Sequence, residues 1–97
     1  MFAIGFTESA LEDLRCLRKA EQKVVLEAIG HQLATEPVTV TRNRKSLRSN
    51  ELSAWELRTG DLRVFYDVDS DRREVTVRAI GRKEHNKLLI RGKEFLL

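Results

Sequence analysis

The chain has 97 residues, of which 41% are hydrophobic and 34% are charged, so it can bury the core of one compact domain but is too short for two. Its single cysteine, Cys16, excludes an internal disulfide, and the sequence offers neither a CxxC motif nor a Cys/His cluster with metal-ligand spacing. The N-terminus lacks the features of a signal peptide, and no run approaches the roughly twenty apolar residues of a membrane span. We therefore expect one domain over residues 1–97 in the cytoplasm, without metal, cofactor or membrane contact.

Positive charge is concentrated in the second part of the chain. The net charge is +3, but residues 1–37 hold four Lys or Arg and six Asp or Glu, whereas residues 38–97 hold fourteen and nine. Residues 42–48 carry four cations and no acid, and residues 82–93 carry five cations and one acid. Either segment alone is typical of a solvated loop. Together with arginine-bearing strands they indicate contact with phosphates.

The first part of the chain predicts one strand and two helices. Apolar residues alternate with small ones over residues 2–6, and Thr7 follows as a candidate helix N-cap. Leucines at helical spacing over residues 11–17 and an apolar stripe over residues 25–33 predict two helices that cover one face of a sheet. Glu36 precedes a proline and is expected to end the second helix.

Residues 55–80 predict three antiparallel strands, because apolar and charged residues alternate through three short runs. The apolar face is expected to hold Trp55, Leu57, Leu62, Val64, Tyr66, Val68, Val75, Val77 and Ala79. The opposite face is expected to hold Glu56, Arg58, Arg63, Phe65, Thr76 and Arg78. Three arginines without matching carboxylates favour a phosphate-rich ligand.

These elements predict an α+β fold, with two N-terminal helices packed on a mainly antiparallel four-stranded sheet in the order β-α-α-β-β-β. Residues 38–52 are expected to form an irregular basic connection, and the second face of the sheet is expected to stay exposed. Residues 88–97 form an apolar tail around Gly92. We expect this tail to fold back as a short strand or turn on the sheet edge or the helices.

Several segments, in this order, resemble the RelE/ParE superfamily of toxins from bacterial type II toxin–antitoxin modules. They are the opening strand with its ALEDL helix, a second helix ending in EP, a K-x-L step at Lys45, the strand pair WELRTGDLRVFYDV and the closing VTVRAIGRK. The resemblance implies a small RNase-like fold and a cognate antitoxin, with which the toxin can form a heterotetramer. It also implies a target, which is ribosome-bound mRNA in the RelE branch and DNA gyrase in the ParE branch.

Metal-free RNA cleavage requires a base, an acid and cations that stabilise the phosphorane. By resemblance to RelE, Lys45, Arg63 and Lys83 are the catalytic candidates. Leu89 stands where the family pattern has a tyrosine, and His85 is a candidate to replace the missing acid because imidazole exchanges protons near neutral pH. Further RNA contacts are expected from Arg42, Arg44, Arg48, Arg58, Arg78, Arg82 and Lys87.

The sequence thus favours a toxin that cleaves mRNA on the ribosome. Two alternatives stay open. The first is a ParE-like inhibitor of DNA gyrase, which the missing tyrosine favours. The second is an inactive protein of RelE fold that serves as an antitoxin-binding or regulatory partner.

Overall fold

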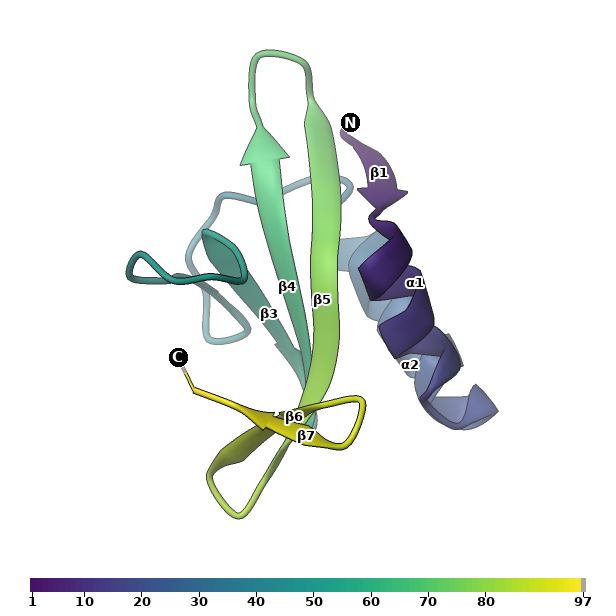
Figure 1. The fold of residues 1–97 in the computed structure, drawn as a ribbon. Helices are drawn as coiled ribbons and strands as arrows, with labels where there is room; N and C mark the ends of the chain where they lie inside the picture. Colours follow the sequence, from purple (N-terminus) through teal and green to yellow (C-terminus); the bar gives the residue numbers. More distant parts are fainter. Residues whose placement is uncertain (97) are drawn as a thin grey trace.

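Two helices and a seven-stranded sheet make up the computed structural model, which describes residues 1–96 (Figure 1). The helices are α1 (Glu8–Arg15) and α2 (Lys19–Gln32). The strands are β1 (Ala3–Phe6), β2 (Arg44–Ser46), β3 (Trp55–Thr59), β4 (Leu62–Asp69), β5 (Glu74–Glu84), β6 (Lys87–Ile90) and β7 (Lys93–Phe95). Neighbours are antiparallel in the order β2-β3-β4-β5-β6-β7, and β1 pairs in parallel with the first part of β5. The predicted α+β class with two helices on a mainly antiparallel sheet is confirmed.

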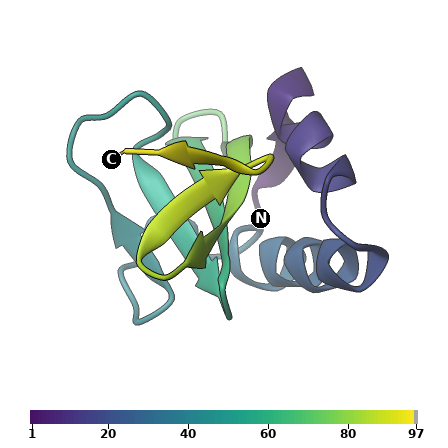
Figure 2. The same ribbon diagram turned by 60° about the horizontal axis from the view of Figure 1, so that its bottom comes forward.

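The sheet contains seven strands rather than the predicted four. Strand β2 lies inside residues 38–52, which were expected to be irregular, and β6 and β7 form a C-terminal hairpin. Because β2 and β7 have only three residues each, alternation cannot reveal them. The hairpin bears out the expectation that the apolar tail folds back on the sheet (Figure 2). Leu97, the last residue of that tail, lies outside the described residues.

Thr7 begins α1 as predicted. Its backbone is extended, with φ −72° and ψ 161°, and its Oγ1 accepts a hydrogen bond of 3.1 Å from the amide of Ala10. This bond satisfies one of the amides that a helix N-terminus leaves without an intrahelical partner. Glu8 in the first turn adds a favourable charge at the positive end of the helix dipole.

Helix α2 ends at Gln32 and not at Glu36, four residues earlier than the proline rule predicts. The guanidinium of Arg44 explains this end, because its Nη1 donates to the carbonyl of Gln32 at 3.1 Å. Its Nε donates to the carbonyl of Thr39 at 3.1 Å. Arg44 therefore caps the helix with a side chain from β2, and the chain turns away before the proline is reached.

The main core lies between the helices and the sheet, and Tyr66 is its largest fully buried side chain. The Tyr66 hydroxyl donates to the carbonyl of Pro37 at 2.6 Å, and burial raises the pKa of this phenol to about 12. The Trp55 ring stacks on it with 6.3 Å between ring centroids. Tyr66 is a packed aromatic, as the alternation predicts.

A β-bulge in β5 reverses the expected sidedness of its second half. Tyr66 pairs with Val77 and Phe65 pairs with Ala79, so Arg78 is the extra residue. The prediction that Ala79 faces the helices is therefore wrong, because one inserted residue moves every later side chain to the opposite face. Ile80 takes the helix side and joins the main core instead.

The second face of the sheet is partly covered, contrary to the expectation that it stays exposed. Phe65, Ala79 and Leu88 form a second buried cluster there. The partly buried side chains that pack on this cluster are Leu47, Leu52, Ile90 and Phe95. The loop before β3 and the C-terminal hairpin thus cover part of this face.

Candidate functional site

Basic side chains meet on the sheet face that points away from the helices. Lys45 in β2 lies opposite Glu56 in β3, and Arg58 in β3 lies opposite Arg63 in β4. Arg63 in turn lies opposite Gly81 in β5. Directly opposed residues of antiparallel strands have Cβ atoms about 5 Å apart, so Lys45, Arg58 and Arg63 occupy one small area.

Glu56 lies at the centre of this area, although it is an acid. It is 3% exposed, and its Oε2 lies 3.6 Å from Lys45 Nζ and 3.4 Å from Arg58 Nε. The prediction that the arginines of this face lack matching carboxylates is therefore wrong. Glu56 was expected on this face but not as part of the site, although the alternation that locates Arg58 and Arg63 locates Glu56 equally well.

Arg63 is held by the turn that precedes it. Its Nη1 donates to the carbonyls of Gly60 at 2.8 Å and Leu62 at 2.9 Å. Its Nε is buried and has no hydrogen-bond partner within the described residues. Burial lowers the pKa of Arg63. The positive charge of Arg58 lowers this pKa further, whereas the nearby Glu56 carboxylate raises it. A guanidinium nevertheless stays charged, so Arg63 presents a fixed cation with an unused donor.

Lys83 lies close to Arg63, whereas His85 does not. Lys83 follows Gly81 by two residues and shares its face, and its backbone amide donates to the Asp61 carbonyl at 2.8 Å. His85 occupies the turn between β5 and β6 with φ 51° and is exposed. Four strand residues span roughly 13 Å, so His85 is far along the strand from Arg63. His85, the candidate to replace the missing acid, therefore does not lie beside Arg63 and Lys83.

Four of the seven expected RNA contacts have partners within the protein, and the pair of Arg58 with Glu56 is one of them. Arg44 is only 7% exposed, and it caps α2. Arg82 binds both oxygens of Glu21 in α2, at 2.7 and 2.8 Å, because the bulge turns it to the helix side. Arg78 forms a 2.8 Å ion pair with Asp67. The remaining three, Arg42, Arg48 and Lys87, are exposed on the surface.

Leu89 does not face Arg63. It lies opposite Arg82, which points toward α2, whereas Lys83 lies opposite Leu88 of the second cluster. Leu89 also lines a hollow beside Cys16 and Gly92. The position where the family pattern has a tyrosine is thus turned away from the cations in this structure.

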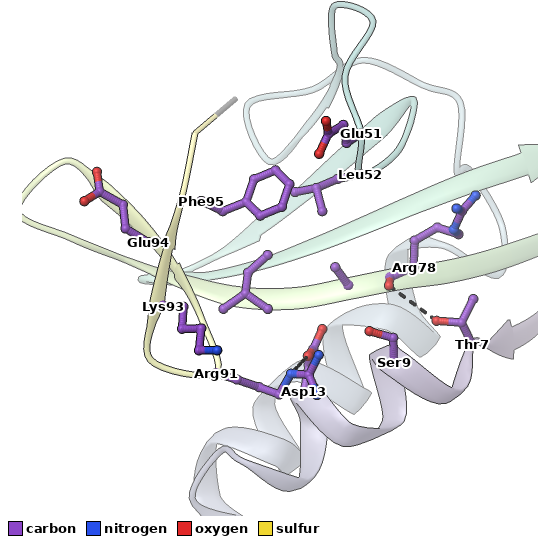
Figure 3. A pocket seen from close by; sticks show the side chains of 12 residues that line it. Thr7, Ser9, Asp13, Glu51, Leu52, Arg78, Arg91, Lys93, Glu94 and Phe95 are labelled. Atoms are coloured by element: carbon purple, nitrogen blue, oxygen red, sulfur yellow. Dashed lines mark hydrogen bonds and ion pairs between the residues drawn. The ribbon is translucent and has the colours of Figure 1, made fainter.

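A groove of about 790 Å³ lies between α1, β5 and the C-terminal hairpin (Figure 3). Arg91 reaches across it from the hairpin, with Nε 2.9 Å from Asp13 Oδ1 and Nη1 2.6 Å from Glu12 Oε2. Burial raises the pKa of Asp13, while the hydrogen bond from the Ile80 amide and the charge of Arg91 oppose this rise. The groove has cations and acids in similar measure, and no motif in the sequence indicates it.

Residues 1–96 contain neither a candidate metal site nor a membrane-spanning helix. No group of three or more His, Cys, Asp or Glu side chains in this range is placed to hold a metal ion. No helix in the same range is long and apolar enough to cross a membrane.

Comparison with solved structures gives similar folds. A chain of the toxin–antitoxin complex RelBE2 from Mycobacterium tuberculosis matches with a TM-score of 0.74 and 26% identity over 84% of this chain and 91% of that one. A chain of an archaeal RelE–RelB complex from Pyrococcus horikoshii matches with a TM-score of 0.68 and 23% identity, over 84% of this chain and 93% of that one. A chain of the intact RelBE toxin–antitoxin complex of E. coli matches with a TM-score of 0.61 and 19% identity, over 88% of this chain and 100% of that one. No protein-family model and no curated protein matches the chain.

Proposed function

We propose that the chain, which has the fold of RelE toxins, is the toxin of a toxin–antitoxin pair and that it cleaves mRNA. The observation that supports cleavage is the group of Lys45, Arg58, Arg63 and Lys83 on one sheet face. The carbonyls of Gly60 and Leu62 fix the Arg63 guanidinium within this group.

The proposed reaction is attack of an RNA 2′-hydroxyl on the neighbouring phosphorus. Negative charge grows on the phosphate oxygens as the phosphorane forms, and fixed cations stabilise that charge. The Arg63 guanidinium is held by two backbone carbonyls, so it needs little reorganisation when the charge develops. Lys83 supplies a proton to the leaving 5′-oxygen in this proposal, because an ammonium group is a proton donor.

Leu89 supports one alternative function. Its apolar side chain faces away from Arg63, so the site holds no aromatic group from this position on which an RNA base could stack. A ParE-like protein that binds DNA gyrase without cleaving RNA would need no such group. An inactive relative that serves only as an antitoxin-binding partner is the remaining candidate.

The partner in this proposal is a cognate antitoxin, as in the three similar complexes. An acidic or amphipathic antitoxin segment would complement the basic face, and such contacts weaken as salt rises. A dissociation constant that does not change between low and high salt would indicate an apolar contact that leaves the cations free.

Two assays on the same preparation test the function. The purified protein is incubated with ribosomes and mRNA, and cleavage is mapped by primer extension. In parallel, it is incubated with DNA gyrase and relaxed plasmid, and supercoiling is measured. We expect cleaved mRNA and unchanged supercoiling. Intact mRNA with inhibited gyrase would replace the proposal by the ParE-like function, and no effect in either assay would favour the inactive relative.

A further inference from the structure

Glu56 is the buried carboxylate of the basic face. It projects from β3 between Lys45 on β2 and Phe65 on β4, and its Oε2 contacts two cations at 3.4 and 3.6 Å. Lys45 and Arg58 are 48% and 44% exposed at their side chains, while Glu56 is 4% exposed beneath them. The two cations thus form a cover that a ligand can reach, and the carboxylate lies under this cover.

The cleavage proposed above requires a group that accepts the 2′-hydroxyl proton. Guanidinium groups are protonated at all relevant pH values, and an ordinary lysine loses its proton only near pH 10. The neighbouring cations Lys45, Arg58, Arg63 and Lys83 are therefore suited to bind phosphate and donate protons. A carboxylate next to cations is already in the form that accepts a proton at neutral pH.

We propose that Glu56 is the proton acceptor of the reaction, an inference that rests on the proposed RNA cleavage. The entering phosphate draws Lys45 and Arg58 toward its oxygens, and Glu56 Oε2 becomes free to accept a hydrogen bond from the 2′-hydroxyl. The proton then moves to Glu56 as the bond between O2′ and phosphorus forms. The bond from phosphorus to O5′ breaks, and the leaving oxygen takes a proton from Lys83. The products are a 2′,3′-cyclic phosphate and a 5′-hydroxyl, and exchange with water restores both side chains.

A simpler role for Glu56 would be to position Lys45 and Arg58. The two roles differ in their effect on RNA binding. A positioning carboxylate is needed for both binding and cleavage, because without it the two cations repel each other. A proton acceptor is needed for cleavage alone, and its removal takes a negative charge away from the phosphate site, so that binding is equal or tighter.

The test measures both properties in Glu56→Gln. Single-turnover cleavage of ribosome-bound mRNA is expected to fall at least about a hundredfold. Binding of an RNA with a 2′-deoxy group at the cleavage site is expected to stay equal or become tighter. Asp61→Asn is the matched control, because Asp61 is an exposed acid near Arg63 and Lys83, and it should cleave at the parent rate. Cleavage by Glu56→Gln within about tenfold of the parent, or loss of binding together with cleavage, would overturn the inference.

A second measurement uses the parent protein and so does not depend on the folding of the variant. Glu56 lies among the positive charges of Lys45, Arg58 and Arg63. If it is the proton acceptor, the cleavage rate should not change between pH 6 and 9. With a lysine as acceptor, the rate should rise about tenfold for each pH unit, as the deprotonated fraction grows. A rising rate overturns the assignment of Glu56 but leaves the proposed function in place. A parent that cleaves no RNA overturns both.

Discussion

The Asp13 carboxylate accepts a hydrogen bond of 3.0 Å from the backbone amide of Ile80. This amide lies in the part of β5 between the end of its pairing with β1 at Val77 and the start of its pairing with β6 at Arg82. Helix α1 covers this part of β5. The hydroxyl of Thr7, its N-cap residue, also donates to the carbonyl of Arg78 at 3.3 Å. The side chains of Asp13 and Thr7 thus bond backbone groups of β5 that neither β1 nor β6 reaches.

Replacing Asp13 should therefore destabilise the fold. Asp13→Ala leaves the buried Ile80 amide without its acceptor, and the free energy of unfolding should fall by about 1–3 kcal/mol. Asp13→Asn keeps an oxygen acceptor and should lose less. Glu12→Gln is the control, because Glu12 is exposed. Urea unfolding of the three variants checks the order, and a fully stable Asp13→Ala would show that water satisfies the amide.

Gly81 is required by the close approach of β6. A Cβ atom at this position would lie 2.5 Å from the Leu89 carbonyl oxygen and 2.9 Å from Ile90 Cγ1. Gly81→Ala should lower the free energy of unfolding by about 1–3 kcal/mol, because backbone has to move. The matched control is Gly30→Ala in α2, where a Cβ meets nothing within 4 Å, so it should be neutral or stabilising by up to about 1 kcal/mol. Equal thermal melting of both variants would contradict this reading.

The sequence predicted the strands correctly where a strict two-residue alternation holds. It failed in the second half of β5, because nothing in the residues around Arg78 marks the bulge that turns Ala79 and Arg82 to new sides. It also failed for Arg44, since a cation in a basic segment gives no sign that helix carbonyls will bury it. The placement of Arg58 and Arg63 on one face follows directly from alternation, whereas Lys45 joins them through β2, which alternation cannot reveal.

Arg44 and Lys45 are neighbours that should respond oppositely to mutation. Arg44→Met removes the donors to Gln32 and Thr39, so it should lower the melting temperature and leave RNA affinity of the folded protein unchanged. Lys45→Met removes an exposed cation from the phosphate site. It should weaken RNA binding and reduce its salt dependence, with little change in melting temperature. If both variants lose RNA affinity to the same extent, Arg44 contacts RNA after all.

Arg63→Ala should abolish growth arrest without unfolding the protein. The loss of a fixed cation at the phosphorane is expected to remove about 3 kcal/mol of transition-state stabilisation, roughly a hundredfold in rate. Arg63→Lys should recover part of the activity, because it keeps the charge but not the planar donor set. Arg72→Ala, at a 78% exposed side chain in the turn between β4 and β5, is the control. Unchanged arrest by a folded Arg63→Ala protein would exclude this residue from the site.

The ion pair between Arg82 and Glu21 predicts a specific acid response. Hydrogen bonds from Arg18 and then Arg82 lower the pKa of Glu21 to about 2 from its ordinary value of 4.5. The unfolded chain therefore binds more protons than the folded one between these values. The stabilisation by Glu21 is fully present above pH 4.5 and is lost as the pH falls toward about 2.

Glu21→Gln tests this response. At pH 7 the variant should be less stable by about 1 kcal/mol, the upper range for a partly exposed pair, which corresponds to roughly 4–8 °C in melting temperature. The difference in melting temperature between parent and variant should shrink as the pH falls below 4.5 and largely vanish near pH 2. The Glu21 carboxyl of the parent then becomes neutral, like the glutamine of the variant. Glu27→Gln, at an exposed acid of the same helix, should melt like the parent throughout. A gap that stays constant from pH 7 to 2 would mean that Glu21 stabilises the fold by its shape and not by its charge.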